Sequence, residues 1–146
     1  MSTRRKIPLT LRRQVITRAQ NRCEYCRAPE TFSLDTFEVD HIQPVSTTGG
    51  DTLDNLAFAC RNCNNRKQDA TAAIDPETEQ SVPLYHPRRD QWHDHFVWSE
   101  DALRILALSP TGRATIVRLQ LNRLGAVNVR RALLALDEEH PPSSDL

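Results

Sequence analysis

The sequence predicts a small α+β domain with a zinc site at its centre, flanked by an N-terminal helix and by a C-terminal extension of a hairpin and helices. Three observations support this fold class. Two Cys-x2-Cys pairs, Cys23–Cys26 and Cys60–Cys63, enclose a loop of 33 residues. Residues 32–41 of that loop are rich in β-prone side chains, and segments outside the pairs repeat apolar residues at helical spacing. The 146 residues suffice for one domain with a small appendage.

The first predicted helix begins at Thr10, a residue type that caps helix N-termini, and continues to about Gln20. Apolar residues repeat along one face of this segment, and arginines occupy the other face. The apolar positions are Leu11, Val15, Ile16 and Ala19, and the arginines are Arg12, Arg13 and Arg18.

Between the cysteine pairs, the pattern predicts two strands and the start of a helix. Partial alternation over residues 32–41 indicates a strand that ends at Asp40-His41. Residues 52–59 are expected to return as a short turn and strand into the second cysteine pair. A polar helix should follow from Cys63 to about Ala73, carrying Arg66 and Lys67.

The C-terminal half is predicted to form a linker, a hairpin and two helices. Three prolines within residues 75–89 indicate a loop or linker. Residues 92–98 alternate aromatic and polar side chains and are expected to pair with 103–108 as a hairpin. Helices should follow Ser109-Pro110 and span about 127–136. We therefore expect a core at 1–75, a packed extension at 76–137 and a disordered tail at 138–146.

The four cysteines are best explained as zinc ligands. Two Cys-x2-Cys segments, called here the first and second zinc knuckles, supply the four thiolates of a tetrahedral site: Cys23, Cys26, Cys60 and Cys63. The chain contains no apolar run long enough for a membrane span or a signal peptide, so we expect no membrane partner and a cytoplasmic location. In that reducing compartment zinc is favoured over the alternatives, which are disulfides, an iron–sulfur cluster or plain buried cysteines.

Charge is unevenly distributed along a chain whose net charge is zero. Residues 1–30 contain eight Arg or Lys and two acids, a balance of +6, whereas residues 31–60 contain five acids and no Arg or Lys. A basic segment beside an acidic one suits an enzyme that binds a phosphate backbone and holds a divalent cation. The alternative is that the N-terminal arginines form a solvated face.

The order of motifs closely resembles the HNH endonuclease family, whose core is the ββα-metal fold. The motifs are Cys-x2-Cys, Val-Asp-His-Ile, Gly-Gly-Asp-x3-Asn-Leu and Cys-x2-Cys-Asn-x2-Lys, within residues 20–70. Residues 86–96 and 109–115 also resemble the C-terminal extension of a bacterial, notably cyanobacterial, HNH subgroup. The sequence assigns no chemistry to that extension.

The resemblance implies a role for each central residue. His41 is the general base, and Asn55 pins the histidine-bearing loop through hydrogen bonds. Asp40 and Asn64 hold the catalytic divalent ion. Both supply hard oxygen ligands, so Mg²⁺ or Mn²⁺ is favoured over softer metals. A histidine titrates near neutrality and can accept a proton from the attacking water.

Each of these residues has a simpler explanation. In that explanation Asp40 is only a hydrogen-bond acceptor at a strand end, Asn55 is an ordinary turn residue, and His41 is a surface histidine. His93 and His95 are expected to pack or face solvent rather than bind metal, and Trp92, Phe96 and Trp98 to join the core rather than stack on bases. The segment around His86, Arg88 and Arg89 either touches DNA or folds over the domain.

The function predicted from these residues is metal-dependent hydrolysis of phosphodiester bonds in DNA, most simply double-stranded DNA. Backbone contacts are assigned to Arg12, Arg13, Arg18, Arg66 and Lys67. Two alternatives stay open: cleavage of RNA, and a zinc-containing nucleic-acid-binding module without turnover. The presence of Asp40, His41, Asn55 and Asn64 in one order favours the enzyme, because a zinc module has no need of them.

Overall fold

The computed structural model describes residues 7–44 and 50–143. Its elements run through the chain in a mixed order of helices and short antiparallel strands. They are α1 (Leu9–Arg18), the 3-10 helix η1 (Glu30–Phe32), β1 (Glu38–His41), the 3-10 helix η2 (Leu53–Asn55), β2 (Leu56–Ala59), α2 (Arg61–Lys67), β3 (Ala72–Ile74), β4 (Ser81–Pro83), α3 (Trp92–His95), β5 (Phe96–Trp98), β6 (Ile105–Ala107), α4 (Pro110–Leu119) and α5 (Leu124–Ala135). The α+β fold class predicted from the sequence is confirmed.

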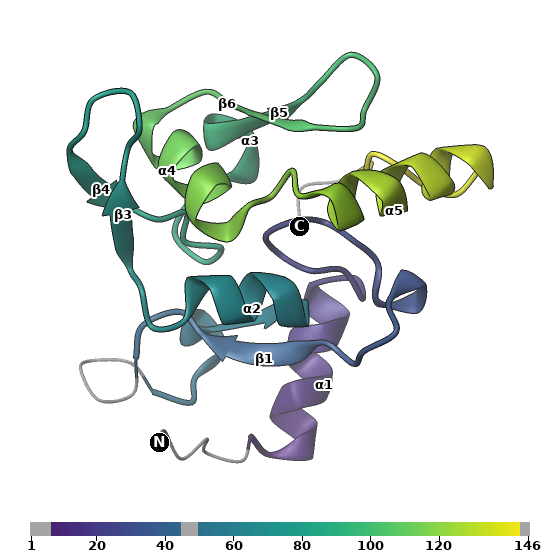
Figure 1. The fold of residues 1–146 in the computed structure, drawn as a ribbon. Helices are drawn as coiled ribbons and strands as arrows, with labels where there is room; N and C mark the ends of the chain where they lie inside the picture. Colours follow the sequence, from purple (N-terminus) through teal and green to yellow (C-terminus); the bar gives the residue numbers. More distant parts are fainter. Residues whose placement is uncertain (1–6, 45–49, 144–146) are drawn as a thin grey trace.

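Two strands and one helix form the part of the fold that carries the motifs. Strands β1 and β2 pair antiparallel, with Asp40 opposite Ala57 and His41 opposite Leu56. Every residue of β2 is buried, so both faces of that strand are covered. Helix α1 contacts β2 and helix α2 contacts β1 (Figure 1). This arrangement is compatible with the ββα-metal core that the sequence resemblance implies.

The first helix and the first strand differ from their predicted limits. Helix α1 begins at Leu9, so Pro8 holds the N-cap position in place of Thr10 and no side chain caps the helix. The strand is confined to residues 38–41, because the four residues of β2 offer no partner for residues 32–37. Leu34, counted among the alternating apolar residues, is fully exposed.

Helix α2 is shorter than predicted and ends at Lys67. Gln68 leaves the helix with φ 54° and ψ −134°. Arg118 of α4 donates from Nε to the carbonyl of Arg66 at 3.0 Å and from Nη2 to that of Lys67 at 3.3 Å. A residue 51 positions later therefore satisfies carbonyl groups that a longer helix would bond internally.

The segment predicted as a loop or linker over 75–89 contains strand β4, which pairs with β3 as a hairpin. Buried Asp75 organises the turn by accepting hydrogen bonds from the Glu77 amide and the Thr78 hydroxyl. Arg113 of α4 adds two bonds of 2.9 Å to the same carboxylate, and these bonds lower the pKa of Asp75.

The rest of the extension is close to its prediction. Strands β5 and β6 form the expected hairpin, but residues 92–95 are the short helix α3 rather than part of a strand. Ser109 caps α4 by accepting from the Gly112 amide at 3.0 Å, and α5 occupies the predicted last helix. Helix α4 contacts α2, β3, β4, α3 and β6, so it joins the extension to the motif-bearing part.

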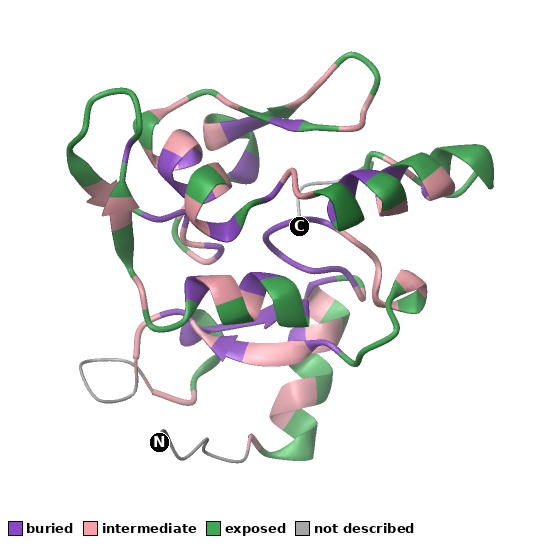
Figure 2. Cartoon of the chain, viewed as in Figure 1, coloured by how far each residue is buried: buried purple, intermediate pink, exposed green. Residues whose placement is uncertain are grey.

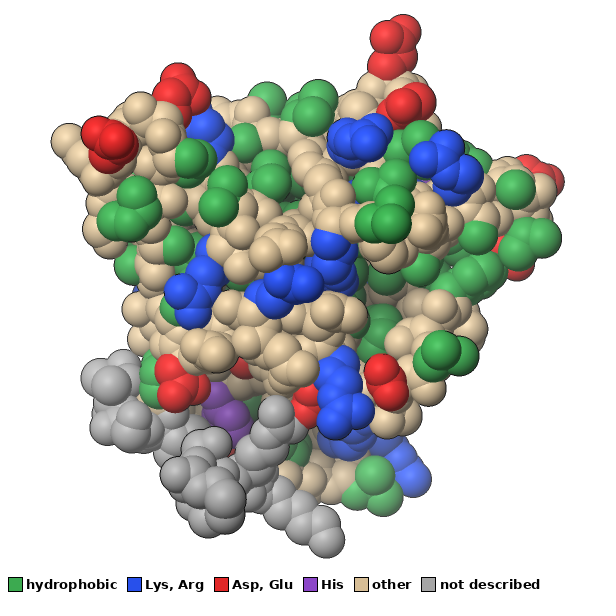
Figure 3. Space-filling model, in the orientation of Figure 1, with side chains coloured by type: hydrophobic (Ala, Val, Ile, Leu, Met, Phe, Trp, Pro, Cys, Tyr) green, Lys and Arg blue, Asp and Glu red, His purple; other side chains and the backbone are tan. Residues whose placement is uncertain are grey.

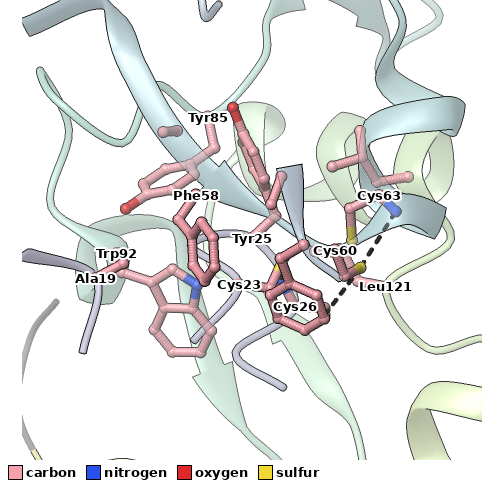
Figure 4. Close-up of a cluster of buried hydrophobic side chains, with 14 of the residues drawn as sticks. Ala19, Cys23, Tyr25, Cys26, Phe58, Cys60, Cys63, Tyr85, Trp92 and Leu121 are labelled. Atoms are coloured by element: carbon pink, nitrogen blue, oxygen red, sulfur yellow. Dashed lines mark hydrogen bonds between the residues drawn. The ribbon is translucent and has the colours of Figure 1, made fainter. Parts of the chain in front are cut away.

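One buried cluster unites both halves of the chain. It includes side chains from α1 through Leu121, and Trp92 and Phe96 belong to it, as the sequence predicted. Figure 4 shows Tyr25, Phe58, Tyr85 and Trp92 gathered beside the cysteines. Burial is most continuous over residues 22–27 and 55–60, whereas much of α5 is exposed (Figure 2). No helix in the described ranges is long and apolar enough to cross a lipid bilayer.

The tail predicted as disordered begins at residue 138, and its first residues make contacts. Arg22 donates from Nη2 to the carbonyl of Glu139 at 2.6 Å. The His140 ring lies edge-on to Trp98, and its Nε2 is 2.7 Å from the carbonyl oxygen of Ala102. Residues 144–146 of this tail lie outside the described part.

Candidate functional site

The four cysteines of the two zinc knuckles converge on one point. Cys23, Cys26, Cys60 and Cys63 are buried, and their sulfur atoms all lie within 4.8 Å of one another. The Sγ atoms of Cys26 and Cys60 are 3.8 Å apart. A tetrahedral site with Zn–S bonds of about 2.3 Å has its sulfurs about 3.8 Å apart, so the cluster fits a zinc-like ion.

The groups around the cysteines also suit thiolate ligands. The Cys26 amide donates to Cys23 Sγ at 3.4 Å, and the Cys63 amide donates to Cys60 Sγ at 3.3 Å. Arg123, between α4 and α5, donates to Cys60 Sγ at 3.4 Å and to Cys63 Sγ at 3.6 Å. Burial lowers the pKa of Arg123, but attraction to the cysteines outweighs it, so the net shift is upward. This fixed positive charge offsets the negative charge of four thiolates.

His41 stands at the end of β1 and is held by a carboxylate that the sequence reasoning did not assign. Its Nε2 lies 2.7 Å from Oδ1 of Asp51, and both side chains are about one-fifth exposed. A carboxylate accepts hydrogen bonds, so Nε2 carries the proton and Nδ1 presents its lone pair. An Asp–His pair of this kind orients an imidazole for proton transfer.

Asn55 holds the segment that follows His41. Its Oδ1 accepts from the Gln43 amide at 2.9 Å, and its Nδ2 donates to the carbonyls of Gln43 at 3.1 Å and Gly50 at 3.0 Å. These bonds tie together the two ends of the loop between β1 and η2. Residues 45–49 of that loop lie outside the described part.

Asp40 points to the opposite side of β1 from His41 and is buried. Its Oδ2 accepts from the Tyr25 hydroxyl at 3.1 Å and pairs with Lys67 Nζ at 3.2 Å. Burial raises the pKa of the Asp40 carboxyl, and Lys67 and Tyr25 act against that shift. Within the described residues, the hydrogen bond and the ion pair of this carboxylate are made by Oδ2 and not by Oδ1.

Asn64 and Lys67 are three positions apart on α2 and therefore share one face of the helix. Because Lys67 reaches Asp40, that face is turned toward β1. The Asn64 side chain is half-buried and forms no hydrogen bond with the described residues. A side-chain amide oxygen on the helix face that is turned toward a carboxylate is the kind of ligand that a hard cation prefers.

The arginines and lysine predicted to contact nucleic acid divide into two groups. Arg12 donates to the carbonyl of Phe37, and Arg18 donates to those of Leu53 and Leu56 at 2.7 and 2.6 Å. Lys67 is only 2% exposed. These three groups support the fold, whereas Arg13 is exposed and Arg66 is half-buried.

Basic side chains gather on the outer face of α2 and toward its border with α4 (Figure 3). Arg66 and Arg118 belong to this region, because Arg118 bonds to the carbonyl of Arg66. Arg66 was predicted from the sequence to contact nucleic acid. Arg118 was not, because only the packing of α4 brings it to α2.

The other histidines have structural surroundings. His95 shares a hydrogen bond of 2.6 Å with Ser109, and its ring contacts Tyr85 and Phe96. The His93 ring lies against Trp92. In the described part of the chain, the cysteine cluster is the one group of three or more His, Cys, Asp or Glu placed to hold a metal.

The segment that begins at His86 folds over the domain. Nδ1 of His86 accepts from the backbone amides of Arg88 and Arg89, both at 3.2 Å. The Arg88 guanidinium pairs with Glu24, which is 1% exposed. Of the two roles considered for this segment, contact with DNA or folding over the domain, Arg88 has the second. Arg89 is exposed.

Comparison with known proteins agrees with this geometry. Residues 23–70 match the model of the HNH endonuclease family, which confirms the resemblance seen in the sequence. A segment of 64 residues, 43% of the chain, is 39% identical to the CRISPR-associated endonuclease Cas9 of Corynebacterium diphtheriae. The chain spans 6% of that protein's length. No solved structure gives a significant match.

Proposed function

Because residues 23–70 match the HNH endonuclease family, we propose that this chain is a metal-dependent endonuclease that hydrolyses phosphodiester bonds in DNA. The observation that carries the proposal is the Asp51–His41 pair at the end of β1, adjacent in sequence to Asp40 and followed by the loop that Asn55 pins. A zinc module that only binds nucleic acid has no need for an oriented imidazole, so this pair favours the enzyme.

His41 is the general base of the proposed reaction. Its Nε2 is occupied by Asp51, so the lone pair on Nδ1 accepts the proton of a water molecule that attacks phosphorus. Asp51 stabilises the positive charge that forms on the ring. Asn55 contributes by fixing the backbone on both sides of the loop, which keeps His41 and Asp51 in register.

Asp40 and Asn64 are the proposed ligands of the catalytic cation. They would hold it through Oδ1 of the carboxylate and the side-chain amide oxygen. When bound, a divalent ion supplies a Lewis acid that stabilises charge on the phosphate and on the leaving 3′ oxygen. Two hard oxygens favour Mg²⁺ or Mn²⁺. The positive charge of Lys67 offsets the negative charge on Oδ2 of Asp40. We therefore assign Lys67 to this site and not to nucleic-acid contact.

Zinc is the proposed ion of the cysteine cluster, because four thiolates at tetrahedral spacing suit its preferences. Such a site needs reduced cysteines, which supports a cytoplasmic location. Elemental analysis of purified protein should find about one zinc per chain. Protein that is folded and free of zinc would refute the assignment.

The proposed activity is tested with supercoiled plasmid and labelled RNA, each with Mg²⁺, Mn²⁺ or EDTA. We expect divalent-ion-dependent nicking of the plasmid. His41→Ala should lower the rate by about 10²–10⁴-fold, the usual contribution of a general base, without loss of DNA binding. If the protein cleaves RNA in preference to plasmid, its substrate is RNA and not DNA. An unchanged cleavage rate in His41→Ala would contradict the role of His41 as general base. Wild-type protein that binds DNA but does not cut it would favour the nucleic-acid-binding module.

DNA contacts are assigned to Arg13 and Arg66, the two members of the predicted set whose side chains donate no hydrogen bond to, and form no ion pair with, the described residues. Arg66→Gln should weaken binding to all DNA sequences alike and reduce the slope of log K against log salt by about one. Arg18→Gln is the matched variant, since it removes the same charge from a side chain bonded to Leu53 and Leu56. It should lower the melting temperature and leave the salt slope unchanged. A reduced salt slope in Arg18→Gln with an unchanged slope in Arg66→Gln would instead place the DNA-binding surface on α1.

A further inference from the structure

The two central residues of the first zinc knuckle reach into the hairpin that carries the catalytic motif. Glu24 and Tyr25 lie between the ligands Cys23 and Cys26. The Glu24 amide donates to the carbonyl of Phe58 at 2.8 Å, and the Phe58 amide donates to Oε2 of Glu24 at 2.8 Å. The knuckle is thereby attached to β2 by two bonds and has little freedom to shift along it.

Tyr25 extends from this attached knuckle to β1. It is 1% exposed, and its ring packs edge-to-face against Tyr85 with centroids 6.4 Å apart. Its hydroxyl donates to Oδ2 of Asp40 at 3.1 Å, the oxygen that also pairs with Lys67. Figure 4 shows Tyr25 between Tyr85 and the cysteines. Two donors from different elements thus converge on one oxygen of the carboxylate.

We propose that Tyr25 is a positioning residue that couples the zinc knuckle to the catalytic carboxylate of Asp40. The inference rests on the proposed function, in which Oδ1 of Asp40 holds the divalent ion. Tyr25 and Lys67 fix Oδ2, and a carboxylate fixed at one oxygen has its other oxygen fixed as well. Oδ1 is then the oxygen held in place for the proposed ion.

The coupling follows from where Tyr25 stands in the chain. Zinc ligands lie two residues before and one residue after it, so the backbone of Tyr25 is held as long as the cysteine cluster is intact. The zinc site then influences the chemistry without touching substrate. Partners that orient a metal ligand typically contribute about 10–100-fold in metal affinity or activity.

The test is Tyr25→Phe, with Tyr85→Phe as the matched control. Both variants remove one hydroxyl from a buried tyrosine and keep the ring. Tyr85 is 2% exposed, and the tyrosine hydroxyl that donates to Asp40 is that of Tyr25. Three quantities are measured in each: zinc content, Mn²⁺ affinity by electron paramagnetic resonance, and the Mn²⁺ dependence of plasmid nicking.

Tyr25→Phe should keep one zinc per chain and a melting temperature near that of Tyr85→Phe. Its Mn²⁺ affinity, measured without DNA, should fall by about 10–100-fold, and half-maximal nicking should need correspondingly more Mn²⁺. Tyr85→Phe should match wild type in both. The affinity measurement is independent of turnover.

Three outcomes would overturn the coupling. One is wild-type Mn²⁺ affinity in Tyr25→Phe, another is an equal change in both variants, and the third is loss of zinc or folding in Tyr25→Phe, which would make the hydroxyl a support of the fold. Failure of the proposed function is distinguishable, because wild-type protein would then nick no substrate with any divalent ion.

Discussion

At the scale of single residues, the proposed chemistry depends most on the hydrogen bond between His41 and Asp51. The bond fixes which ring nitrogen carries the proton, and only the other nitrogen can act as a base. Asp51→Asn exchanges an acceptor for a group that can also donate, so the imidazole is no longer held in one tautomer. We expect plasmid nicking to fall by at least about tenfold, with DNA affinity and zinc content unchanged.

Asp54→Asn is the control for this prediction. It makes the same chemical change three positions away, where the carboxylate accepts from Thr52 and does not touch His41. Nicking by Asp54→Asn should equal that of wild type. Equal rates in the two variants would show that Asp51 does not orient the base.

The residues with motif spacing were predictable, and their partners were not. Cys-x2-Cys spacing predicted the four converging sulfurs, and the position of Asn55 predicted a residue that pins the loop. Lys67 was assigned to nucleic-acid contact, but α2 turns it toward buried Asp40. Asp51 stands in the Gly-Gly-Asp-x3-Asn-Leu motif, but no role was assigned to it from the sequence. Such pairs depend on how the elements pack in three dimensions, which sequence spacing alone does not report.

At the scale of elements, the close approach of α3 and α4 depends on the absence of a side chain at Gly112. A Cβ at this position would overlap the carbonyl oxygen of His95 and lie 3.3 Å from Cβ of Ala107. Backbone oxygen cannot move as a flexible side chain can. Gly112→Ala should therefore destabilise the protein by about 1–3 kcal/mol, measured by denaturant unfolding.

Gly125→Ala, in α5, is the matched substitution. A Cβ there meets nothing within 4 Å, and alanine favours helix over glycine by up to about 1 kcal/mol. Its stability should equal or exceed that of wild type. Equal losses in both variants would mean that the α3–α4 contact has no special need of glycine.

Elements with a local signal were predictable, such as the α4 start at Ser109-Pro110 and the β5–β6 hairpin. The β3–β4 hairpin was missed because each strand has three residues and Pro83 ends the second. Its turn is built by Asp75 with Arg113, 38 residues away. The local sequence pattern did not predict this hairpin, because its turn is stabilised by an arginine far along the chain.

At the scale of the whole molecule, the first zinc knuckle is held by the extension as well as by the hairpin. Glu24 pairs with Arg88, and Arg27 lies over the Trp92 ring at 4.9 Å. Arg130 of α5 donates to the carbonyl of Cys26 at 3.5 Å and lies over the Trp98 ring at 5.1 Å. No role could be assigned to the extension from the sequence, and these contacts give it a supporting role.

These contacts predict that residues 1–75 do not fold on their own, although they contain all four cysteines and every proposed catalytic residue. Without the extension, Glu24 is left as a buried carboxylate without its arginine, which costs about 3–5 kcal/mol. The shared cluster also loses Tyr85, Trp92, Phe96, Ile105, Leu119 and Leu121. That loss is comparable with the whole stability of a small domain, roughly 5–15 kcal/mol.

The measurement is thermal unfolding of fragment 1–75 with zinc, compared with the full chain and with fragment 1–137. The second fragment loses the contacts of Glu139 and His140 and keeps the cluster, so it should melt cooperatively with a loss of about 1–2 kcal/mol. Fragment 1–75 should bind zinc through its thiolates but show no cooperative transition. A sharp transition near that of the full chain would instead make 1–75 an independent domain, and the arginine contacts across the boundary would then contribute little to stability.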